Sequence, residues 1–232
     1  MELKNYSDFI TTLLDSGFSM GGGNDEGIFA VVPFSWTESP RYETPVRWHT
    51  GDPETDPWEW RIRVLDERDD IAYSKLFFRK SGYITKEWYP YFFAVRRNGM
   101  SFEEEYANGT ISQPAKRIYN AIKDHEVLPL HAIKELAGFG KDEKSHFERA
   151  LVDLQMKMYI TMCGRQQKIS QQGNEYGWSS TVFCQTESFF CEDVFQKANK
   201  ISSTEAFTII KEQIYDLNPE AQEKKIIKFI RG

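Results

Sequence analysis

One stretch of the sequence, residues 112–184, constrains the fold more than any other, because it predicts three short helices followed by a β-hairpin. Ser112 is a suitable N-cap for the first helix, and Pro114 is tolerated in the opening turn of a helix. A second helix is expected over residues 130–137, and Gly138 ends it. After a glycine-containing turn, a third helix is expected over residues 142–158.

The hairpin is expected from two runs rich in β-forming residues, at 158–163 and 176–183. A polar segment, residues 164–175, is expected to form the loop between them. Three helices followed by a hairpin are typical of a winged helix, a compact relative of the helix-turn-helix modules that dock on DNA. This order predicts an ability to bind and does not name a reaction.

The flanking parts of the chain predict further strands and helices, so the fold class is α+β. A short buried strand is expected over residues 28–32, a long irregular loop over residues 35–57, which contain four prolines, and a turn at Ser81-Gly82. A helix with Ser202 as N-cap is expected over residues 202–217, and a last helix is expected to end at about residue 230.

The chain is expected to divide into three regions, and charge separates them. Residues 1–111 form an aromatic-rich N-terminal α+β region with 12 basic and 19 acidic residues, a net charge of −7. Residues 112–184 form the winged-helix domain, with 10 basic and 8 acidic residues, a net charge of +2. Residues 185–232 form a C-terminal helical region, expected to pack on the winged helix. The candidate binding module is therefore only slightly basic.

The third helix is the expected place for contacts with double-stranded DNA. Its apolar residues mark the core-facing side, and the remaining faces offer Lys141, Lys144, Ser145, Arg149 and Gln155. Lysine and arginine there are suited to phosphates, and Arg149 is suited to guanine edges in the major groove. The alternative is an ordinary solvated helix face, which the acidic residues on the same helix favour.

The polar segment between the hairpin strands is a second candidate for DNA contact. Its residues Arg165, Gln166, Gln167 and Lys168, with the pair Gln171-Gln172, are suited to the DNA backbone or the minor groove. A plain solvent-exposed hairpin tip is equally consistent with this composition.

Two features of the long loop invite a functional interpretation. A histidine and three carboxylates fall within residues 49–56, a composition that metal sites share. No second histidine lies nearby, so a loop held by Asx-type turns is the preferred interpretation, and no metal is expected. Trp48, Trp58 and Trp60 are candidates for a pocket that stacks an extruded base, although clustered tryptophans more often serve core or loop packing.

The sequence also lacks several strong signals. It contains no glycine-rich phosphate loop, HExxH, GxSxG or zinc-spaced cysteine set, so no cofactor is expected. No apolar run is long enough for a membrane-spanning helix, and no secretory signal is visible. Its three cysteines fit a reduced cytoplasm.

Several runs resemble a known family. They lie within residues 48–97, as DPWEWRIRV, IAYSKLFFRKSGYITKEWYPYF and AVRR, and from Ala150, as ALVDLQMKMYITMCG. These runs are similar to those of the AlkZ-related proteins, small bacterial proteins related by fold to winged-helix DNA glycosylases of the AlkZ type. The resemblance implies winged-helix elements and a link to DNA repair.

The resemblance does not extend to the catalytic motif of those glycosylases. They use a Gln-x-Gln or Gln-x-Asp motif to position the attacking water, and this motif cannot be placed among the glutamines here. No catalytic residue is therefore carried over. The leading expectation is a DNA-binding protein linked to repair. The alternatives are a glycosylase that excises alkylated bases and a protein-interaction module whose winged helix does not bind DNA.

Overall fold

The computed structural model describes residues 2–169 and 175–232, and its mixture of helices with one antiparallel sheet confirms the α+β class. In chain order the elements are α1 Tyr6–Ser16, β1 Phe18–Met20, α2 Pro57–Glu67, β2 Ile71–Phe77, β3 Lys80–Thr85, α3 Tyr89–Arg97, α4 Phe102–Ala107, α5 Gln113–His125, β4 Val127–Pro129, α6 Leu130–Leu136, η1 Lys141–Glu143, α7 Lys144–Met156, β5 Ile160–Ile169, β6 Glu175–Gln185, α8 Thr186–Phe189, α9 Glu192–Lys200, α10 Ser203–Leu217 and α11 Glu223–Arg231.

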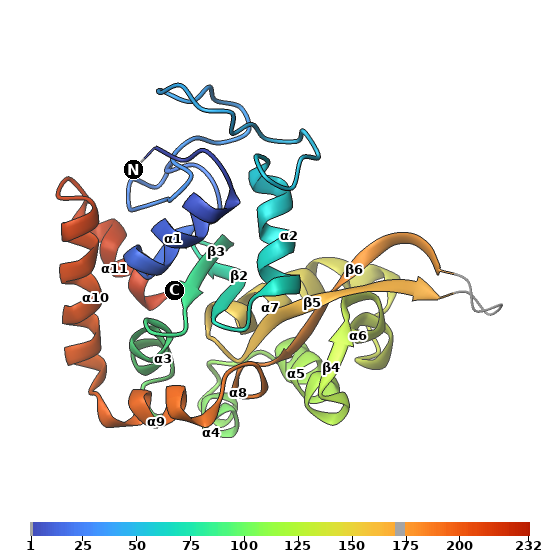
Figure 1. Cartoon of the computed structure of the whole chain (residues 1–232). Coiled ribbons are helices and arrows are strands. Elements are labelled where there is room, and N and C mark those ends of the chain that lie inside the picture. The colour runs from blue at the N-terminus through green and yellow to red at the C-terminus, as the bar shows by residue number, and fades with distance from the viewer. Residues whose placement is uncertain (1, 170–174) are drawn as a thin grey trace.

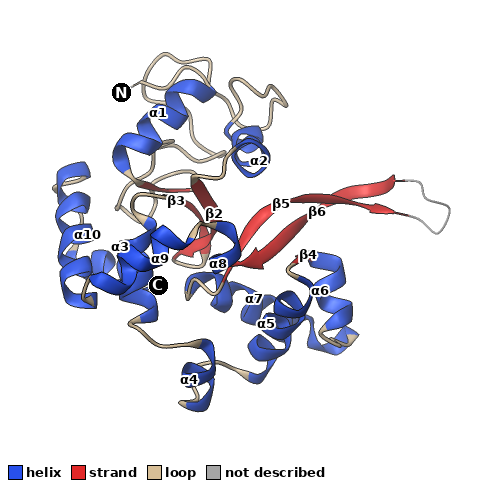
Figure 2. Cartoon of the chain, turned by 60° about the horizontal axis from the view of Figure 1, so that its bottom comes forward, coloured by secondary structure: helices blue, strands red, loops and turns tan. Residues whose placement is uncertain are grey.

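A single six-stranded sheet runs through the protein in the order β1-β3-β2-β5-β6-β4. The N-terminal strands and the central strands meet between β2 and β5, where Tyr73 opposite Met162 is the one pair in register. Beyond that pair the two strands separate. The hairpin β5–β6 then extends away from the rest of the chain (Figures 1 and 2).

The central elements follow the order predicted for residues 112–184. Ser112 caps α5 by accepting a hydrogen bond from the N–H of Ala115, and Gly138, with φ +69°, follows the end of α6. Strand β4 pairs with β6, which pairs with β5. The apolar faces of α5, α6 and α7 enclose a core of their own, with Ile118, Ile133 and Leu154 fully buried. The assignment of this unit as a winged helix stays a prediction.

The hairpin strands are longer than the sequence predicted. Residues 164–169 belong to β5, and β6 begins at Glu175, so the expected loop over residues 164–175 is wrong for most of its length. Polar side chains are compatible with a strand when the strand projects into solvent and buries neither face. The pair Gln171-Gln172 lies outside the described residues.

Two predictions in the N-terminal region are wrong, and both have a local cause. Residues 28–32 form no strand: Val31 donates its N–H to the side-chain Oγ of Ser19, so a regular ladder with β1 does not form. The β2–β3 turn lies at Phe78-Arg79, both with positive φ, and not at Ser81-Gly82. Gly82 is needed inside β3, because a Cβ there would lie 2.4 Å from the ring of Phe77. The long loop expected over residues 35–57 is confirmed up to residue 56, because Pro57 begins α2.

The C-terminal region was expected to pack on the central module. Its helices α9, α10 and α11 instead pack mainly against α3. Phe229 of α11 stacks on Phe77 of β2, with ring centroids 3.9 Å apart, and joins a core that also contains Phe18 and Phe92. Burial of these aromatic rings holds α11 against the N-terminal strands and not against the central module. The expected boundaries at residues 111 and 184 stay a prediction.

A buried arginine ties together the ends of several elements. The guanidinium of Arg96 donates to the carbonyls of Leu76, Met156, Phe229 and Ile230, at 2.8 to 3.0 Å. These carbonyls belong to β2, α7 and α11.

In the described part of the chain, no helix has both the length and the apolar character needed to cross a membrane.

Candidate nucleic-acid interface

A groove of about 430 Å³ lies between α6, the start of α7 and β6, at the centre of the expected winged helix. Lys134 reaches it from α6 and Lys144 from α7, and the hydroxyl residues Ser179, Ser180 and Thr181 line it from β6. Lysine and hydroxyl side chains are among the groups that contact nucleic-acid phosphates. The groove also contains His131 and one acidic side chain, Glu148.

The turn that joins α6 to α7 is held by Arg117 of α5. Its guanidinium donates to the carbonyl of Ala137 and to the carboxylate of Glu143, each at 2.8 Å. It also lies 4.0 Å above the ring of Phe139, which packs edge-on against Phe147. The hydrogen bonds to Arg117 and Gly140 lower the pKa of Glu143, so this carboxylate is charged near neutral pH. The turn is therefore anchored on both sides, which fixes α7 relative to α6.

Four residues predicted on the third helix, Lys141, Lys144, Ser145 and Arg149, are exposed, but the structure does not bring all of them to the groove. Lys144 lines it, with its Nζ 3.8 Å from the carboxylate of Glu148. Lys141 is in η1, and Ser145 and Arg149 are on α7, outside the groove lining. Gln155 is buried and belongs to the core, because its position faces β2.

The predicted wing residues are divided between different partners. Arg165 forms an ion pair with Asp66 of α2 at 2.5 Å, so its charge is already compensated. Gln167 is held within the hairpin: its amide donates to the carbonyl of Gly177 and its oxygen accepts from the hydroxyl of Ser179. Gln166 is exposed opposite Ser180. Lys168 belongs to β5, and its side chain lies outside the described part of the structure.

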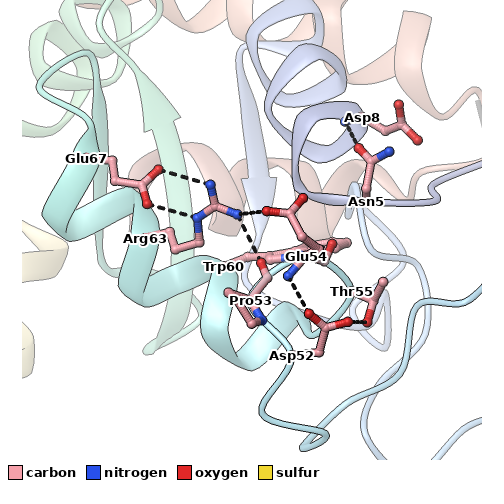
Figure 3. A network of polar contacts seen from close by, with 9 residues as sticks. All are labelled: Asn5, Asp8, Asp52, Pro53, Glu54, Thr55, Trp60, Arg63 and Glu67. Carbon is pink, nitrogen blue, oxygen red and sulfur yellow. Dashed lines mark hydrogen bonds and ion pairs between the residues drawn. The ribbon is translucent and has the colours of Figure 1, made fainter.

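The segment with the candidate metal composition is a loop held by its own hydrogen bonds. Asp52 accepts from the N–H of Glu54 and the hydroxyl of Thr55, and Arg63 of α2 ties Glu54 to Glu67 (Figure 3). Asp56 accepts from the N–H groups of residues 49, 51 and 58, so it caps α2. These contacts confirm the preferred interpretation of Asx-type turns. Within residues 2–169 and 175–232, no cluster of metal-ligating side chains is found.

The three tryptophans proposed for a pocket lie in different surroundings. Trp60 is fully buried and donates its indole N–H to the carbonyl of Glu54 (Figure 3). Trp48 is half-buried and donates to the carbonyl of Phe34. Trp58 is 42% exposed, with the guanidinium of Arg61 stacked 3.5 Å above it. None of the three lines the groove at α6 and α7, and the structure leaves the base-stacking hypothesis untested.

Sequence reasoning missed Lys134 and the hydroxyl residues of β6. The second helix is predicted only by its bounds, although Lys134 lies about one helical turn after Leu130 and therefore shares its face. The hydroxyl run at 179–181 is visible in the sequence, and its partners depend on how β6 lies beside α6. The position of a strand beside two helices depends on the tertiary fold, and no short sequence pattern predicts it.

Comparisons with known proteins give one family. No curated protein and no solved structure matches this chain. A family model described as AlkZ related matches residues 3–231, nearly the whole chain. The match covers the N-terminal strands, the central module and the C-terminal helices alike. The chain therefore belongs to the AlkZ-related family.

Proposed function

We propose that the central module is a winged helix that binds duplex DNA through the groove between α6, α7 and β6. The observation that carries the proposal is the convergence of Lys134, Lys144 and the hydroxyl residues 179–181 on one groove. Such a set holds backbone phosphates without reading bases. The expected contact is therefore weakly dependent on sequence.

The strand pairing supports this assignment. A winged helix needs a small sheet beside its helices, and here β4 pairs with β6 and β6 with β5. The hairpin projects beyond the helices (Figure 2), which leaves its described strands open to a long ligand. Duplex DNA is such a ligand, whereas a small molecule would contact only part of this surface.

The charges predict modest affinity with a marked salt dependence. Among the described residues, Lys134, Lys141 and Arg149 have no ion-pair partner, whereas Lys144 and Arg165 face carboxylates. About three phosphate contacts would give a slope of about −3 in a plot of log affinity against log salt. A protein with a larger basic surface would show a steeper slope.

Family membership extends the proposal toward DNA repair. The family is described as AlkZ related, and the resemblance of the sequence to AlkZ-type DNA glycosylases implies a link to DNA repair. We place the role of this chain in recognition of damaged duplex, and we assign no catalytic residue. A duplex that carries an alkylated base is expected to compete at least as well as the undamaged duplex.

The test is the change in fluorescence anisotropy of a labelled duplex, titrated with the protein at several salt concentrations. Lys134→Glu combined with Lys144→Glu is expected to weaken binding at least about tenfold, because attraction becomes repulsion. Lys200→Glu combined with Lys224→Glu, two exposed residues of α9 and α11 outside the groove lining, changes the net charge by the same amount and serves as the control.

Three outcomes would contradict the proposal. If no duplex binds even at low salt, the protein-interaction alternative is favoured. Equal weakening by the control with Lys200 and Lys224 replaced would mean that net charge, and not the groove, determines affinity. Release of alkylated bases from the DNA would instead support the glycosylase alternative.

A further inference from the structure

A second cavity, of about 690 Å³, opens where four elements meet: the β2–β3 turn, the start of α5, the end of α7 and the end of α11. Its volume lies in the range typical of sites for small molecules, roughly 300–1,000 Å³. It shares no lining residue with the groove between α6 and α7. Any ligand of this cavity would therefore be separate from the proposed duplex contact.

The side chains that line the cavity carry an excess of positive charge. Five are basic and two, Glu26 and Asp153, are acidic. Both carboxylates form ion pairs with basic side chains: Asp153 pairs with Arg79, and Glu26 pairs with Lys80 at 2.8 Å. The basic side chains are Arg79, Arg96, Lys157, Lys228 and Arg231.

Two of these cations are available at the rim. Lys228 and Arg231 are three residues apart on α11, which brings them to the same helix face. Both residues are exposed, and neither forms an ion pair with any residue that the structure describes. The guanidinium of Arg231 lies 5.6 Å from the ring of Phe207, which leaves its N–H groups free to donate.

The inner wall holds a third positive charge, the guanidinium of Arg96, which forms no ion pair with any described residue. Arg96 is buried, its hydrogen bonds go only to backbone carbonyls, and it lies 5.5 Å from the rings of Phe77 and Phe92. Burial lowers its pKa to about 10, which still keeps it protonated near neutral pH. Four hydrogen bonds leave one of its five N–H groups without a partner within the described chain. An anion in the cavity would offset this buried charge.

Another part of the lining is apolar. Phe78 from the β2–β3 turn, Ile111 just before α5, Ala115 in the first turn of α5 and Leu154 from α7 line the cavity. A cavity that combines apolar and cationic lining fits a ligand with a flat, weakly polar ring and an anionic end.

We infer that this cavity binds a phosphate-bearing small molecule of mononucleotide size. The phosphate lies between Lys228 and Arg231, and the ring lies against Phe78 and Ile111. Because the site is separate from the α6–α7 groove, it gives the protein a second ligand, independent of duplex DNA.

The experiment is isothermal titration calorimetry of the whole chain with adenosine monophosphate, adenosine and inorganic phosphate as probes. We expect the nucleotide to bind at least about tenfold more tightly than either part alone, since only the nucleotide satisfies both the rim and the wall. Lys228→Glu, alone and with Arg231→Gln, is expected to weaken the nucleotide at least about tenfold.

The matched control is Lys224→Glu, on the same helix but outside the cavity lining, which is expected to leave nucleotide affinity unchanged. Absence of nucleotide binding at millimolar concentration would overturn the inference. So would inorganic phosphate binding as tightly as the nucleotide, or a Lys224 variant as weak as the Lys228 variant. Circular dichroism confirms that each variant is folded. Duplex affinity of the Lys228 variant should equal that of the unchanged protein, which separates this inference from the proposed DNA contact.

Discussion

The side-chain oxygen of Gln155 accepts a hydrogen bond from the backbone N–H of Lys75, at 3.0 Å. Gln155 lies on α7 and Lys75 on β2, just beyond the point where β2 separates from β5. The amide of Gln155 is held in place because its nitrogen donates to the carbonyl of Leu151. A helix side chain thus supplies the acceptor that the neighbouring strand no longer provides.

Gln155→Leu is expected to lower the free energy of unfolding by about 1–3 kcal/mol, because it leaves the Lys75 N–H without its acceptor. Urea unfolding followed by tryptophan fluorescence measures the change. The control is Gln196→Leu: Gln196 is exposed and, among the described residues, is hydrogen-bonded only to Glu192, so a change within about 0.5 kcal/mol is expected. Equal losses in the two variants would show that the Gln155 contact contributes nothing specific.

Replacement of Arg96 by methionine is expected to cost at least about 3 kcal/mol, since several carbonyls lose a charged donor together. Arg96→Lys retains the charge but not the planar arrangement of donors, and we expect it to restore less than half of the loss. Thermal unfolding measured by circular dichroism gives both values. A lysine variant as stable as the original protein would show that the carbonyl contacts do not require a guanidinium.

Gly82→Ala is expected to destabilise the protein by about 1–3 kcal/mol, because the added Cβ would meet the Phe77 ring and the carbonyl of Ser19. Gly140→Ala is the matched control. Gly140 has a φ of −72°, and the nearest atom to an added Cβ is a Glu143 oxygen 3.7 Å away. Denaturant midpoints of the two variants should therefore differ clearly, and similar midpoints would contradict the packing described for Gly82.

Glu105 is expected to make stability fall at acidic pH. It is buried beside Lys157 and Thr110. Burial alone would raise the pKa of its carboxyl, but the hydrogen bonds from Lys157 and Thr110 outweigh burial, and the pKa is lowered overall. The stabilisation is present above the unfolded pKa of about 4.3 and is lost as pH falls through the lower, folded pKa.

The measurement is the urea midpoint between pH 7 and pH 3, for the unchanged protein and for Glu105→Gln. The variant lacks the titrating carboxyl, so we expect its midpoint to fall less over the acidic part of the range. Parallel curves would show that Glu105 does not contribute to the pH dependence.

The elements with a local signal were predictable from the sequence. Ser112 caps α5 as expected, and Ser202 caps α10 as expected. The features that were not predictable depend on distant partners. The turn at Phe78-Arg79 contains no glycine. Gly82 lies inside β3, where the Phe77 ring and the Ser19 carbonyl leave no room for a Cβ.

The candidate interface was predictable only in part. Lys144 is identified correctly as an exposed cation of the third helix and lies in the groove. Arg165 carries the right charge, but Asp66, almost one hundred residues earlier, compensates it. Spacing along the chain reports the face of one helix, whereas ion pairing depends on elements that meet only in the folded protein.

The core that Phe229 shares with Phe18, Phe77 and Phe92 has a consequence for synthesis. The ribosome releases the N-terminal strands long before residue 229, so their aromatic face has no cover while translation continues. The carbonyl partners of Arg96 on α11 also arrive last. A nascent chain of this protein therefore exposes an aggregation-prone aromatic surface for most of its elongation. Chaperones that bind such surfaces are expected to associate with the chain until α11 emerges from the ribosome.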